Sequence, residues 1–455
     1  MTAEKLNALQ RDILSKTLLF SFHFRFMRNI LKYNLLLFFF CCTICSAESV
    51  TADKFVSVSG QQFIRGGKPY YYIGTNFWYG PILASKGQGG DRKRLKRELD
   101  CMKKIGITNL RILVGAEEGS KNVTSLSPFL LKDGKLNDTL LDGLDYLLRE
   151  LERRDMTAVL YLTNSWDWSG GFGYYLKQTG HGDSPDASGN GYNDYCRYAA
   201  QFYTDAQSQH LYLSHVKKIV SRKNRYTKRA YKDEPSIMAW QLCNEPRPFA
   251  AEMFEPMLQW SRNAATLIKS IDPNHLVSTG SEGIIGCLWN ADVCQRMHAD
   301  ENIDYLTVHI WPVNWGWASR DRLSEALPNV YIESEKYITE NLRIASRLNK
   351  PVVIEEFGYP RDRNSYSLNK PTTARDSFYD FIFTKLLECY TQGGGIAGCN
   401  FWGWGGSGRP RSERWQPGDD YICDPAHEPQ GWYSVFDSDN TTLKLISKYI
   451  ILLKP

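Results

Sequence analysis

The sequence lacks several features that would assign it to other classes of protein. The eight cysteines after residue 47 include no CxxC pair, which argues against a structural zinc site of the usual spacing. The first predicted strand after residue 55 leads to GTNFWYG (74–80) and not to a glycine-rich phosphate-binding loop. This argues against a nucleotide-binding sheet. No RNA- or DNA-binding motif accompanies the basic stretches at 92–98 and 217–229. Solvated helix faces or loops therefore explain these stretches better than nucleic-acid binding.

The N-terminal apolar run is shorter than a membrane span. From Met27, the basic segment MRNILKYN is followed by LLLFFFCCTIC and by Cys45-Ser46-Ala47, the layout of a secretory signal peptide. A spanning helix needs about 20 apolar residues. We therefore predict a signal peptide over 27–47, an upstream extension over 1–26 from a mis-assigned start codon, and export of the mature protein. A membrane anchor is the alternative. Export permits disulfides, and Cys287 and Cys294, close together in a loop-like stretch, are the predicted pair.

The rest of the chain alternates between short apolar runs and helical patterns. No linker, low-complexity tract or internal repeat interrupts it from about residue 55 onward. Amphipathic helical spacing occurs at 91–106 and at 140–155, the latter after an Asn-Asp-Thr cluster suited to capping. Eight strands alternating with helices predict a (β/α)8 barrel, here a single catalytic domain over 48–455, with an open doubly wound sheet as the rival. The predicted strands are 70–76, 108–113, 157–163, 237–244, 275–280, 304–310, 351–356 and 395–402.

Catalytic groups of such barrels lie where the strands end, and the ends of these eight runs carry an unusual set of side chains. Carboxylates, an arginine, a histidine and several tryptophans recur there. Any one of them alone is more simply explained as an ion-pair, cap or packing residue, but their joint occurrence on separate strands favours a functional site. They are Asn76, Trp78, Arg111, Asn164, Trp166, Trp168, Asn244, Glu245, Ser281, Glu282, His309, Trp311, Glu355, Glu356, Trp402 and Trp404.

Hydrolysis of a glycosidic bond requires this combination of side chains. The leaving oxygen needs a proton, and the oxocarbenium-like transition state needs a negative group beneath the sugar ring, so two carboxylates of different pKa serve both needs. Tryptophan faces stack on the apolar faces of sugars. The pair Glu355-Glu356 leaves one choice open: neighbouring strand residues point to opposite faces, and this strand is apolar on both.

The sequence resembles glycoside hydrolase family 5 over nearly all of residues 55–450. WQLCNEPRP (240–248) is similar to the family's Asn-Glu-Pro motif, and IEEFG (354–358) to its Glu-aromatic-Gly motif. The resemblance implies that Glu245 is the general acid/base and Glu356 the nucleophile, with Glu355 pointing the other way. It also predicts a retaining mechanism with the two carboxyl groups about 5–5.5 Å apart.

The same resemblance implies roles for the surrounding side chains. Arg111 is expected to hydrogen-bond the nucleophile, and Asn244 the sugar 2-hydroxyl. Trp402 is expected to form the floor of the subsite for the cleaved sugar. Where the family commonly has tyrosine, this chain has Trp311, which puts the usual hydrogen bond to the nucleophile in doubt. The remaining predicted substrate-binding residues are Trp78, Arg247 and His309.

GTNFWYG, HIWPVNWGW (309–317) and FWGWGGSGRP (401–410) look most like the endo-β-1,4-mannanase branch of the family. We therefore expect a monomer that cleaves β-mannan polysaccharides or manno-oligosaccharides by double displacement, a reaction that requires no cofactor or metal. An endo-β-1,4-glucanase on the same scaffold is the first alternative. A carbohydrate-binding barrel without turnover is the second.

Overall fold

The computed structural model describes residues 55–119, 127–187 and 191–454. The predicted extension over 1–26 and the predicted signal peptide over 27–47 lie outside these residues. Within them, no helix is both long and apolar enough to span a membrane.

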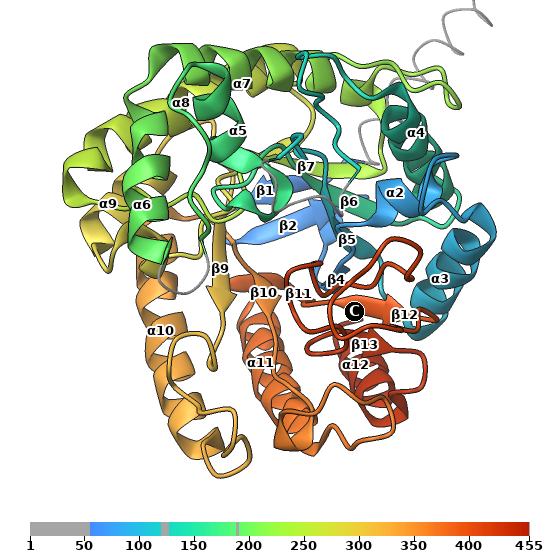
Figure 1. Ribbon diagram of the computed structural model, residues 1–455. Helices are drawn as coiled ribbons and strands as arrows, with labels where there is room; N and C mark the ends of the chain where they lie inside the picture. Colours follow the sequence, from blue (N-terminus) through green and yellow to red (C-terminus); the bar gives the residue numbers. More distant parts are fainter. Residues whose placement is uncertain (1–54, 120–126, 188–190, 455) are drawn as a thin grey trace, which may run out of the picture. The chain divides into compact units, whose positions relative to one another are not determined.

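Eight buried strands form one sheet that is rolled into a barrel (Figure 1). Every pairing between neighbouring strands is parallel, in the order β8-β7-β6-β5-β4-β11-β10-β9. An isolated parallel bridge between Ser278 and Tyr305 brings the two ends of the sheet together. The predicted (β/α)8 barrel is confirmed. Seven of the eight strands fall within a predicted run, and β10 extends one residue beyond its run, to Phe357. The strands are β4 (Tyr72–Asn76), β5 (Asn109–Leu113), β6 (Thr157–Tyr161), β7 (Ile237–Gln241), β8 (Leu276–Ser278), β9 (Leu306–Ile310), β10 (Val352–Phe357) and β11 (Ile396–Phe401).

Helices surround the barrel (Figure 1). Asp91 caps α3 by accepting hydrogen bonds from the backbone N–H groups of Lys93 and Arg94, and the helix ends at Gly106 in the left-handed conformation. Asn137 caps α4 in the same way, as the Asn-Asp-Thr cluster predicts. The helices are α2 (Gly80–Ala84), α3 (Arg92–Ile105), α4 (Asp138–Glu152), α5 (Gly171–Gln178), α6 (Tyr192–Ala200), α7 (Ala206–Val220), α8 (Phe254–Ile271), α9 (Ala291–His298), α10 (Leu327–Leu348), α11 (Thr373–Gln392) and α12 (Asn440–Leu452).

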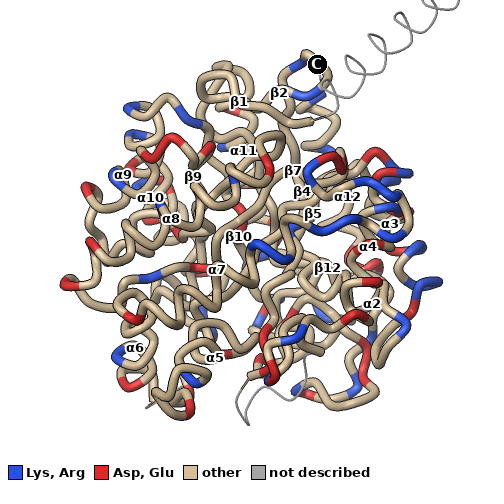
Figure 2. Tube along the Cα trace, turned by 90° about the horizontal axis from the view of Figure 1, so that it is seen from above, with Lys and Arg blue, Asp and Glu red and all other residues tan. Residues whose placement is uncertain are grey.

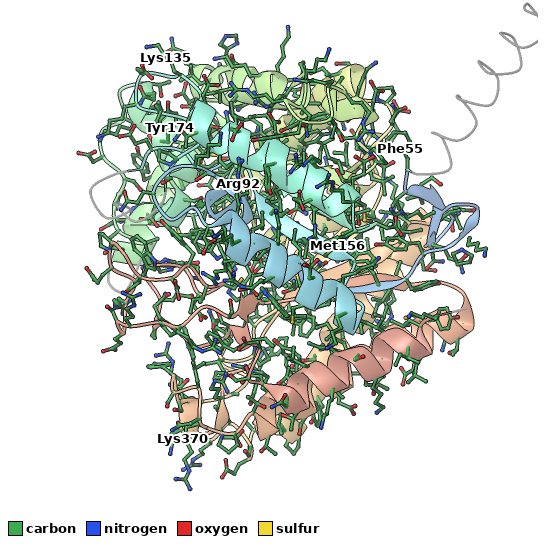
Figure 3. The ribbon with its side chains drawn as sticks, turned by 90° about the vertical axis from the view of Figure 1, so that its right-hand side faces the viewer. Phe55, Arg92, Lys135, Met156, Tyr174 and Lys370 are labelled. Carbon is green, nitrogen blue, oxygen red and sulfur yellow. The ribbon has the colours of Figure 1, made fainter. Side chains whose placement is uncertain are left out.

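The basic stretch at 92–98 lies on α3, where two of its five basic side chains are paired with neighbouring carboxylates. Arg92, at the start of the helix beside α4 (Figure 3), places Nη2 2.6 Å from Asp142 Oδ2. Arg94 and Glu98 are buried and paired at 3.1 Å. Acidic residues accompany the basic ones where α3 and α4 meet (Figure 2). The stretch is therefore one helix with two faces: Arg92 and Arg94 are ion-paired against neighbouring elements, and Lys93, Lys96 and Arg97 are exposed to solvent.

The two ends of the barrel are covered by different elements. The antiparallel sheet of β1 (Ser57–Ser59), β2 (Gln62–Arg65) and β3 (Lys68–Pro69) precedes the first barrel strand, and Phe63 packs there with Tyr72 and Tyr305 from the beginnings of strands. At the carboxyl end, β12 (Trp404–Gly406) and β13 (Val435–Phe436) pair and enclose a long excursion between them. The amino-terminal end is therefore covered by local structure, and the excursion is at the end where the site is expected.

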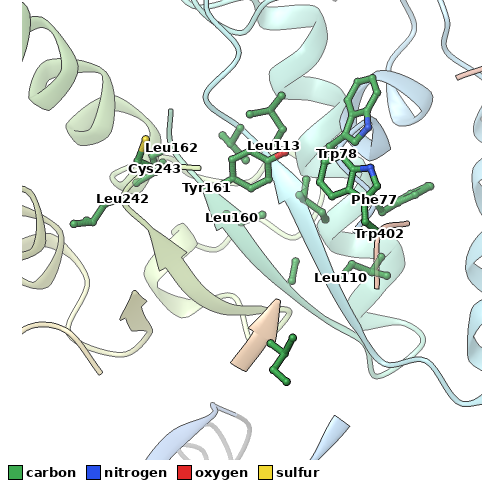
Figure 4. Packing of buried hydrophobic residues seen from close by; sticks show 14 of the residues in the cluster. Phe77, Trp78, Leu110, Leu113, Leu160, Tyr161, Leu162, Leu242, Cys243 and Trp402 are labelled. Carbon is green, nitrogen blue, oxygen red and sulfur yellow. The ribbon is translucent and has the colours of Figure 1, made fainter. Parts of the chain in front are cut away.

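The core fills the space inside and outside the strands. Leu110, Leu160 and Leu242, from neighbouring strands or their ends, are buried with Phe77 and Tyr161 (Figure 4). The disulfide that we predicted between Cys287 and Cys294 is wrong for this structure, because both thiols are free and buried in the hydrophobic core. The two thiols contact each other without a covalent bond, and Cys294 Sγ also lies 3.8 Å from Nδ1 of His298, one helical turn away on α9.

Candidate active site

A cavity of about 910 Å³ opens at the carboxyl ends of the barrel strands. Glu245, Glu356, Asn244, Arg247, Trp311 and Trp402 all contribute to its lining. These are six of the nine side chains that the sequence predicts for the site, and they come from β7, β9, β10 and β11 or the loops that follow them. The topology thus brings residues more than a hundred positions apart into one cavity.

Glu245 follows β7 and presents its carboxylate to two donors. Trp166 Nε1 donates to Oε2 at 2.6 Å, and His309 Nδ1 lies 2.7 Å from Oε1. The backbone of Glu245 is left-handed, with φ of 50°, a conformation that is costly for a residue with a side chain and clusters at functional sites. The Ser165 hydroxyl holds this backbone by donating to the Glu245 carbonyl at 2.5 Å.

Glu356 lies on β10 and is held by one donor on β5 and one directly after β9. Arg111 Nη1 on β5 donates to Oε1, and Trp311 Nε1 donates to Oε2 at 3.2 Å. The hydrogen bond that the change from tyrosine to Trp311 had put in doubt is therefore present. It is made by the one N–H that an indole can donate.

We expected Glu355 to point away from the site, and this prediction is wrong. Gln241 Nε2 donates to both of its carboxylate oxygens, at 2.9 and 2.8 Å, and His309 Nε2 lies 3.4 Å from Oε1. The pairing of β10 with β9 shifts register between Ile354 and Glu356, and such an irregularity breaks the alternation of faces. Both glutamates consequently contact Arg111 and His309, but Glu356 alone of the two lines the cavity.

The separation of the two cavity carboxylates fits one of the two glycosidase geometries. One oxygen of Glu245, one of Glu356 and a ring nitrogen of His309 all lie within 4.8 Å of one another. Retaining enzymes place their carboxyl groups about 5–5.5 Å apart and inverting enzymes about 6.5–9.5 Å apart. Among the described residues this is the cluster close enough to hold a metal ion, but the guanidinium of Arg111 beside Glu356 repels a cation there.

Charge in the cluster is shared between the carboxylates and His309. Burial alone would lower the pKa of His309, but the charge of Glu356 and the hydrogen bonds to Glu245 and Glu355 raise it to about 10. Burial would likewise raise the pKa of Glu245, and the hydrogen bond and charge of His309 instead lower it to about 2. His309 is therefore cationic at neutral pH.

Burial raises the pKa of Glu356 to about 7, with Glu245 and Glu355 adding repulsion against the opposing charges of His309 and Arg111. Because the two cavity carboxyls interact, these values belong to the pair, and the pair holds one proton between about pH 2 and pH 7. His309 Nδ1 lies 2.7 Å from Glu245 and 3.4 Å from Glu356. The same N–H can therefore stabilise whichever of the two carboxylates is ionised.

Arg111 is the centre of the network beneath the cavity. It is fully buried, and its guanidinium donates to Gln241 Oε1 at 2.9 Å, to Asn76 Oδ1 at 3.2 Å and to Asn244 Oδ1 at 2.8 Å, besides Glu356. The amide of Asn244 is thereby oriented with its oxygen on Arg111 and its nitrogen on Asn164, 3.1 Å away. Gln241, the last residue of β7, anchors both Arg111 and Glu355. It was not among the predicted site residues, because the predicted strand continued to residue 244 and its end was therefore placed at Asn244.

Arg247 lies on the Glu245 side of the cavity and is fixed by Glu282. Two parallel hydrogen bonds of 2.5 Å join the guanidinium to the carboxylate, and the guanidinium lies 5.2 Å from the centre of the Trp166 ring. Tyr192 stacks on Trp166 in the same wall of the cavity, with the two ring centres 6.1 Å apart. The sequence pointed to Trp166 and Glu282 only as residues at strand ends, and the structure gives them these partners.

The predicted aromatic residues occupy two different layers. Trp402 and Trp311 line the cavity, with ring centres 5.9 Å apart. Trp78 is buried, donates its N–H to the Cys423 carbonyl at 2.7 Å, and packs edge-on against Trp168. It therefore supports Trp168, which lines the cavity, and does not line the cavity itself. Figure 4 shows Trp78 and Trp402 at the ends of the barrel strands.

The excursion between β12 and β13 adds a wall that the sequence did not reveal. Trp415, His427 and Glu428 from this segment line the cavity. The indole N–H of Trp415 is buried and has no partner among the described residues. Burial raises the pKa of Glu428 to about 8, aided by Asp424 and Glu356. These residues follow no strand end directly, so the strand-end criterion could not find them.

Two glutamates at this separation, at the carboxyl end of a (β/α)8 barrel and surrounded by tryptophans, define a glycoside hydrolase of the retaining kind. The comparisons with known proteins place it more narrowly. The model described as GH family 5 beta-mannosidase-like matches residues 53–454, and the chain belongs to glycoside hydrolase family 5.

Individual relatives agree with this assignment. The chain is 34% identical to a glycoside hydrolase family 5 mannosidase from Rhizomucor miehei, with a TM-score of 0.81 and coverage of 88% of this chain and 98% of that one. It is 28% identical over 393 residues to mannan endo-1,4-beta-mannosidase 1 of Arabidopsis thaliana, covering 83% and 88% of the two chains. An endo-1,4-beta-mannanase from Rhizomucor miehei shares the fold at 22% identity and a TM-score of 0.63, covering 87% and 99%.

Proposed function

We propose that this enzyme is a retaining endo-β-1,4-mannanase, which hydrolyses internal β-1,4-mannosidic bonds of mannan, glucomannan or galactomannan. The observation that carries the mechanism is the approach of Glu245 and Glu356 to within 4.8 Å in an open, tryptophan-lined cavity. The names of the curated relatives, which are mannan endo-1,4-beta-mannosidases, support the choice of mannan.

In the first step Glu356 attacks the anomeric carbon, and Glu245 donates its proton to the leaving oxygen. Because the pKa of Glu356 is raised and that of Glu245 is lowered, the proton that the pair shares has to pass to Glu245 for this step. Arg111 and Trp311 both donate to Glu356 and stabilise its ionised form. When Glu245 is protonated, the Nδ1–H of His309 can donate to Glu356 in place of Glu245.

In the second step water attacks the glycosyl-enzyme. Glu245, now ionised, takes the proton of that water, and Glu356 is the leaving group, so the product keeps the β configuration. Asn244 lines the cavity next to Glu245 with its amide fixed by Arg111 and Asn164. It is thus placed to contact the sugar 2-hydroxyl, where hydrogen bonds strengthen in the transition state.

A second candidate is an exo-acting β-mannosidase that releases single sugars from chain ends. The excursion between β12 and β13 begins after Gly406 and returns at Tyr433, just before β13. The ring centre of Tyr433 is 5.0 Å from that of Trp311 beside Glu356. A wall on the Glu356 side limits the room for sugars that precede the cleaved bond, and Trp415 contributes an indole to this wall. The 34% identical neighbour is named a mannosidase, and one of its structures is a complex with mannosyl-fructose.

Reducing-sugar release from linear β-1,4-mannan, beside carboxymethylcellulose, tests the proposal. Wild type should cut mannan, and Glu356→Ala should not. Cleavage of the cellulose derivative alone would make the enzyme an endo-β-1,4-glucanase. Chromatography of the earliest products separates the modes of attack, because endo action gives a range of oligosaccharides and exo action gives mannose alone.

We further propose that the enzyme is exported and acts as a monomer on extracellular polysaccharide. The layout of residues 27–47 supports export. N-terminal sequencing of protein recovered from the culture medium of an expressing cell should find the mature chain beginning near Ala47 or Glu48. Light scattering of the same material should give the mass of one chain, and a larger mass would contradict the monomer.

A further inference from the structure

Three tryptophans surround Tyr337 at the edge of the cavity. The ring centre of Tyr337 lies 6.0 Å from that of Trp289, 5.3 Å from that of Trp315 and 6.1 Å from that of Trp317. Trp315 and Trp317 are themselves 5.0 Å apart. We call Trp289, Trp315, Trp317 and Tyr337 the Trp289 platform. It joins the loops after β8 and β9 to α10, which packs beside α9 (Figure 1).

The platform is continuous with the catalytic cavity on the side of Glu245. Trp315 belongs to the cavity lining. The hydroxyl of Tyr337 donates to the backbone carbonyl of Glu282 at 2.5 Å, and the carboxylate of Glu282 fixes Arg247, which shares the cavity wall with Glu245. Because Glu245 protonates the leaving oxygen, the platform lies on the side of the sugars that leave.

The members of the platform differ in exposure. Tyr337 is buried, Trp315 and Trp317 are partly buried, and Trp289 is 64% exposed, the largest exposed fraction among the large hydrophobic side chains described. Packing around Tyr337 explains the first three. It does not explain an indole that leaves most of its surface in water.

The backbone that carries Trp289 is strained. Leu288 and Trp289 both adopt the left-handed conformation, with φ of 52° and 62°, which is unfavourable for residues that carry a Cβ. Strain of this kind is found where a segment is held in a shape that a ligand requires. Here the two residues stand between Cys287, at the end of a buried turn, and α9.

We propose that the Trp289 platform is an additional polysaccharide-binding subsite for the leaving-group part of the β-1,4-linked chain, beyond Arg247. Exposed indole faces stack on the apolar faces of sugar rings over a large area with few hydrogen bonds, and Trp315 joins this surface to the cavity. The identity of the sugar as mannose rests on the proposed function. The position of the subsite rests on the geometry alone and holds for endo and exo action.

Kinetics on a series of manno-oligosaccharides, from the trisaccharide to the hexasaccharide, test the subsite. For wild type, kcat/KM should rise with length, and Trp289→Ala should reduce the ratio of hexasaccharide to trisaccharide kcat/KM by about fivefold. Trp289→Phe keeps a ring and should lose less. Ile332→Ala on α10, which removes another exposed apolar side chain, should keep the wild-type ratio. Equal ratios in Trp289→Ala and Ile332→Ala would overturn the proposal.

Electrophoresis through native gels that contain mannan or carboxymethylcellulose separates this proposal from the proposed function. In the Glu356→Ala background, retardation that Trp289→Ala weakens, in either gel, supports the subsite. Retardation that is independent of Trp289 in both gels overturns it. Whether wild type releases sugar from mannan is measured separately and decides the proposed function alone.

Discussion

The indole N–H of Trp311 donates to Oε2 of Glu356 across 3.2 Å. The resemblance to family 5 leads one to expect a tyrosine at this position, and a change of residue type could have left the carboxylate with Arg111 alone. The indole is larger than a phenol and keeps a single donor. It also packs against Trp402 and Tyr433, so it holds the carboxylate and forms part of the cavity wall.

Replacing Trp311 with phenylalanine should lower kcat by roughly 10- to 100-fold, because a hydrogen bond to a charged group is worth about 1.5–3 kcal/mol. Trp311→Tyr restores a donor and should recover part of the loss. Steady-state kinetics on a soluble oligosaccharide measure both. Equal losses in the two variants would mean that packing, and not the hydrogen bond, is what Trp311 provides.

The two glutamates should respond differently to azide. Glu245→Ala should lower the rate of the step that needs a proton by about 10²- to 10⁴-fold, and azide should then yield the β-glycosyl azide from an activated aryl glycoside. With Glu356→Ala, azide attacks the substrate directly and should yield the α-glycosyl azide. Nuclear magnetic resonance of the products distinguishes the two. Reversed configurations would exchange the proposed roles of Glu245 and Glu356.

The activity should fall as the pH rises above about 7. The active pair of Glu245 and Glu356 holds one proton, and the pKa of about 7 at Glu356 is where that last proton is lost. Because the charge of Glu355 contributes to raising this pKa, Glu355→Gln should move the alkaline limb of kcat/KM to lower pH. Glu340→Gln, a change at an exposed ion pair, is the control. A limb that stays in place or moves upward in Glu355→Gln would contradict the coupling.

Asp145 should be a large contributor to stability far from the cavity. It is fully buried on α4 and accepts hydrogen bonds from Arg222 at 3.0 and 2.7 Å and from the Tyr231 hydroxyl at 2.6 Å. Asp145→Asn leaves Arg222 without its counter-charge and should lower the free energy of unfolding by about 3 kcal/mol. Urea denaturation followed by fluorescence measures this. A loss no larger than that in Glu340→Gln would show that the network tolerates a neutral partner.

The fold was predictable because each level of the sequence agrees with it. The apolar runs, the cap at Asn137 and the helical spacing of residues 91–106 all specify the same alternation. The cavity residues at strand ends could be found for the same reason, since parallel strands bring their carboxyl ends to one face.

The remaining features depend on three-dimensional contacts that no local pattern encodes. Glu355 faces the site because the pairing of β10 with β9 shifts register between Ile354 and Glu356. The regular alternation of side chains along a strand does not predict such a shift. The burial of Trp78 behind Trp168 depends on Cys423, from the distant excursion. Gln241 lies inside a run that was predicted to continue to residue 244, and Glu428 lies in the excursion, away from the ends of the barrel strands. Only the closed barrel shows that Gln241 anchors Arg111 and that Glu428 lines the cavity.

The ends of the barrel sheet meet at the bridge between Ser278 and Tyr305, and we expect local unfolding to begin there. A junction marked by one isolated bridge, beside the three-residue strand β8, protects its backbone amides less than the longer ladders on the opposite side. Deuterium should therefore enter β8 and the start of β9 before it enters β5 and β6. Because Glu282 and Trp289 follow β8, loosening of this junction would release the leaving-group side of the cavity while Arg111 and Glu356 keep their places.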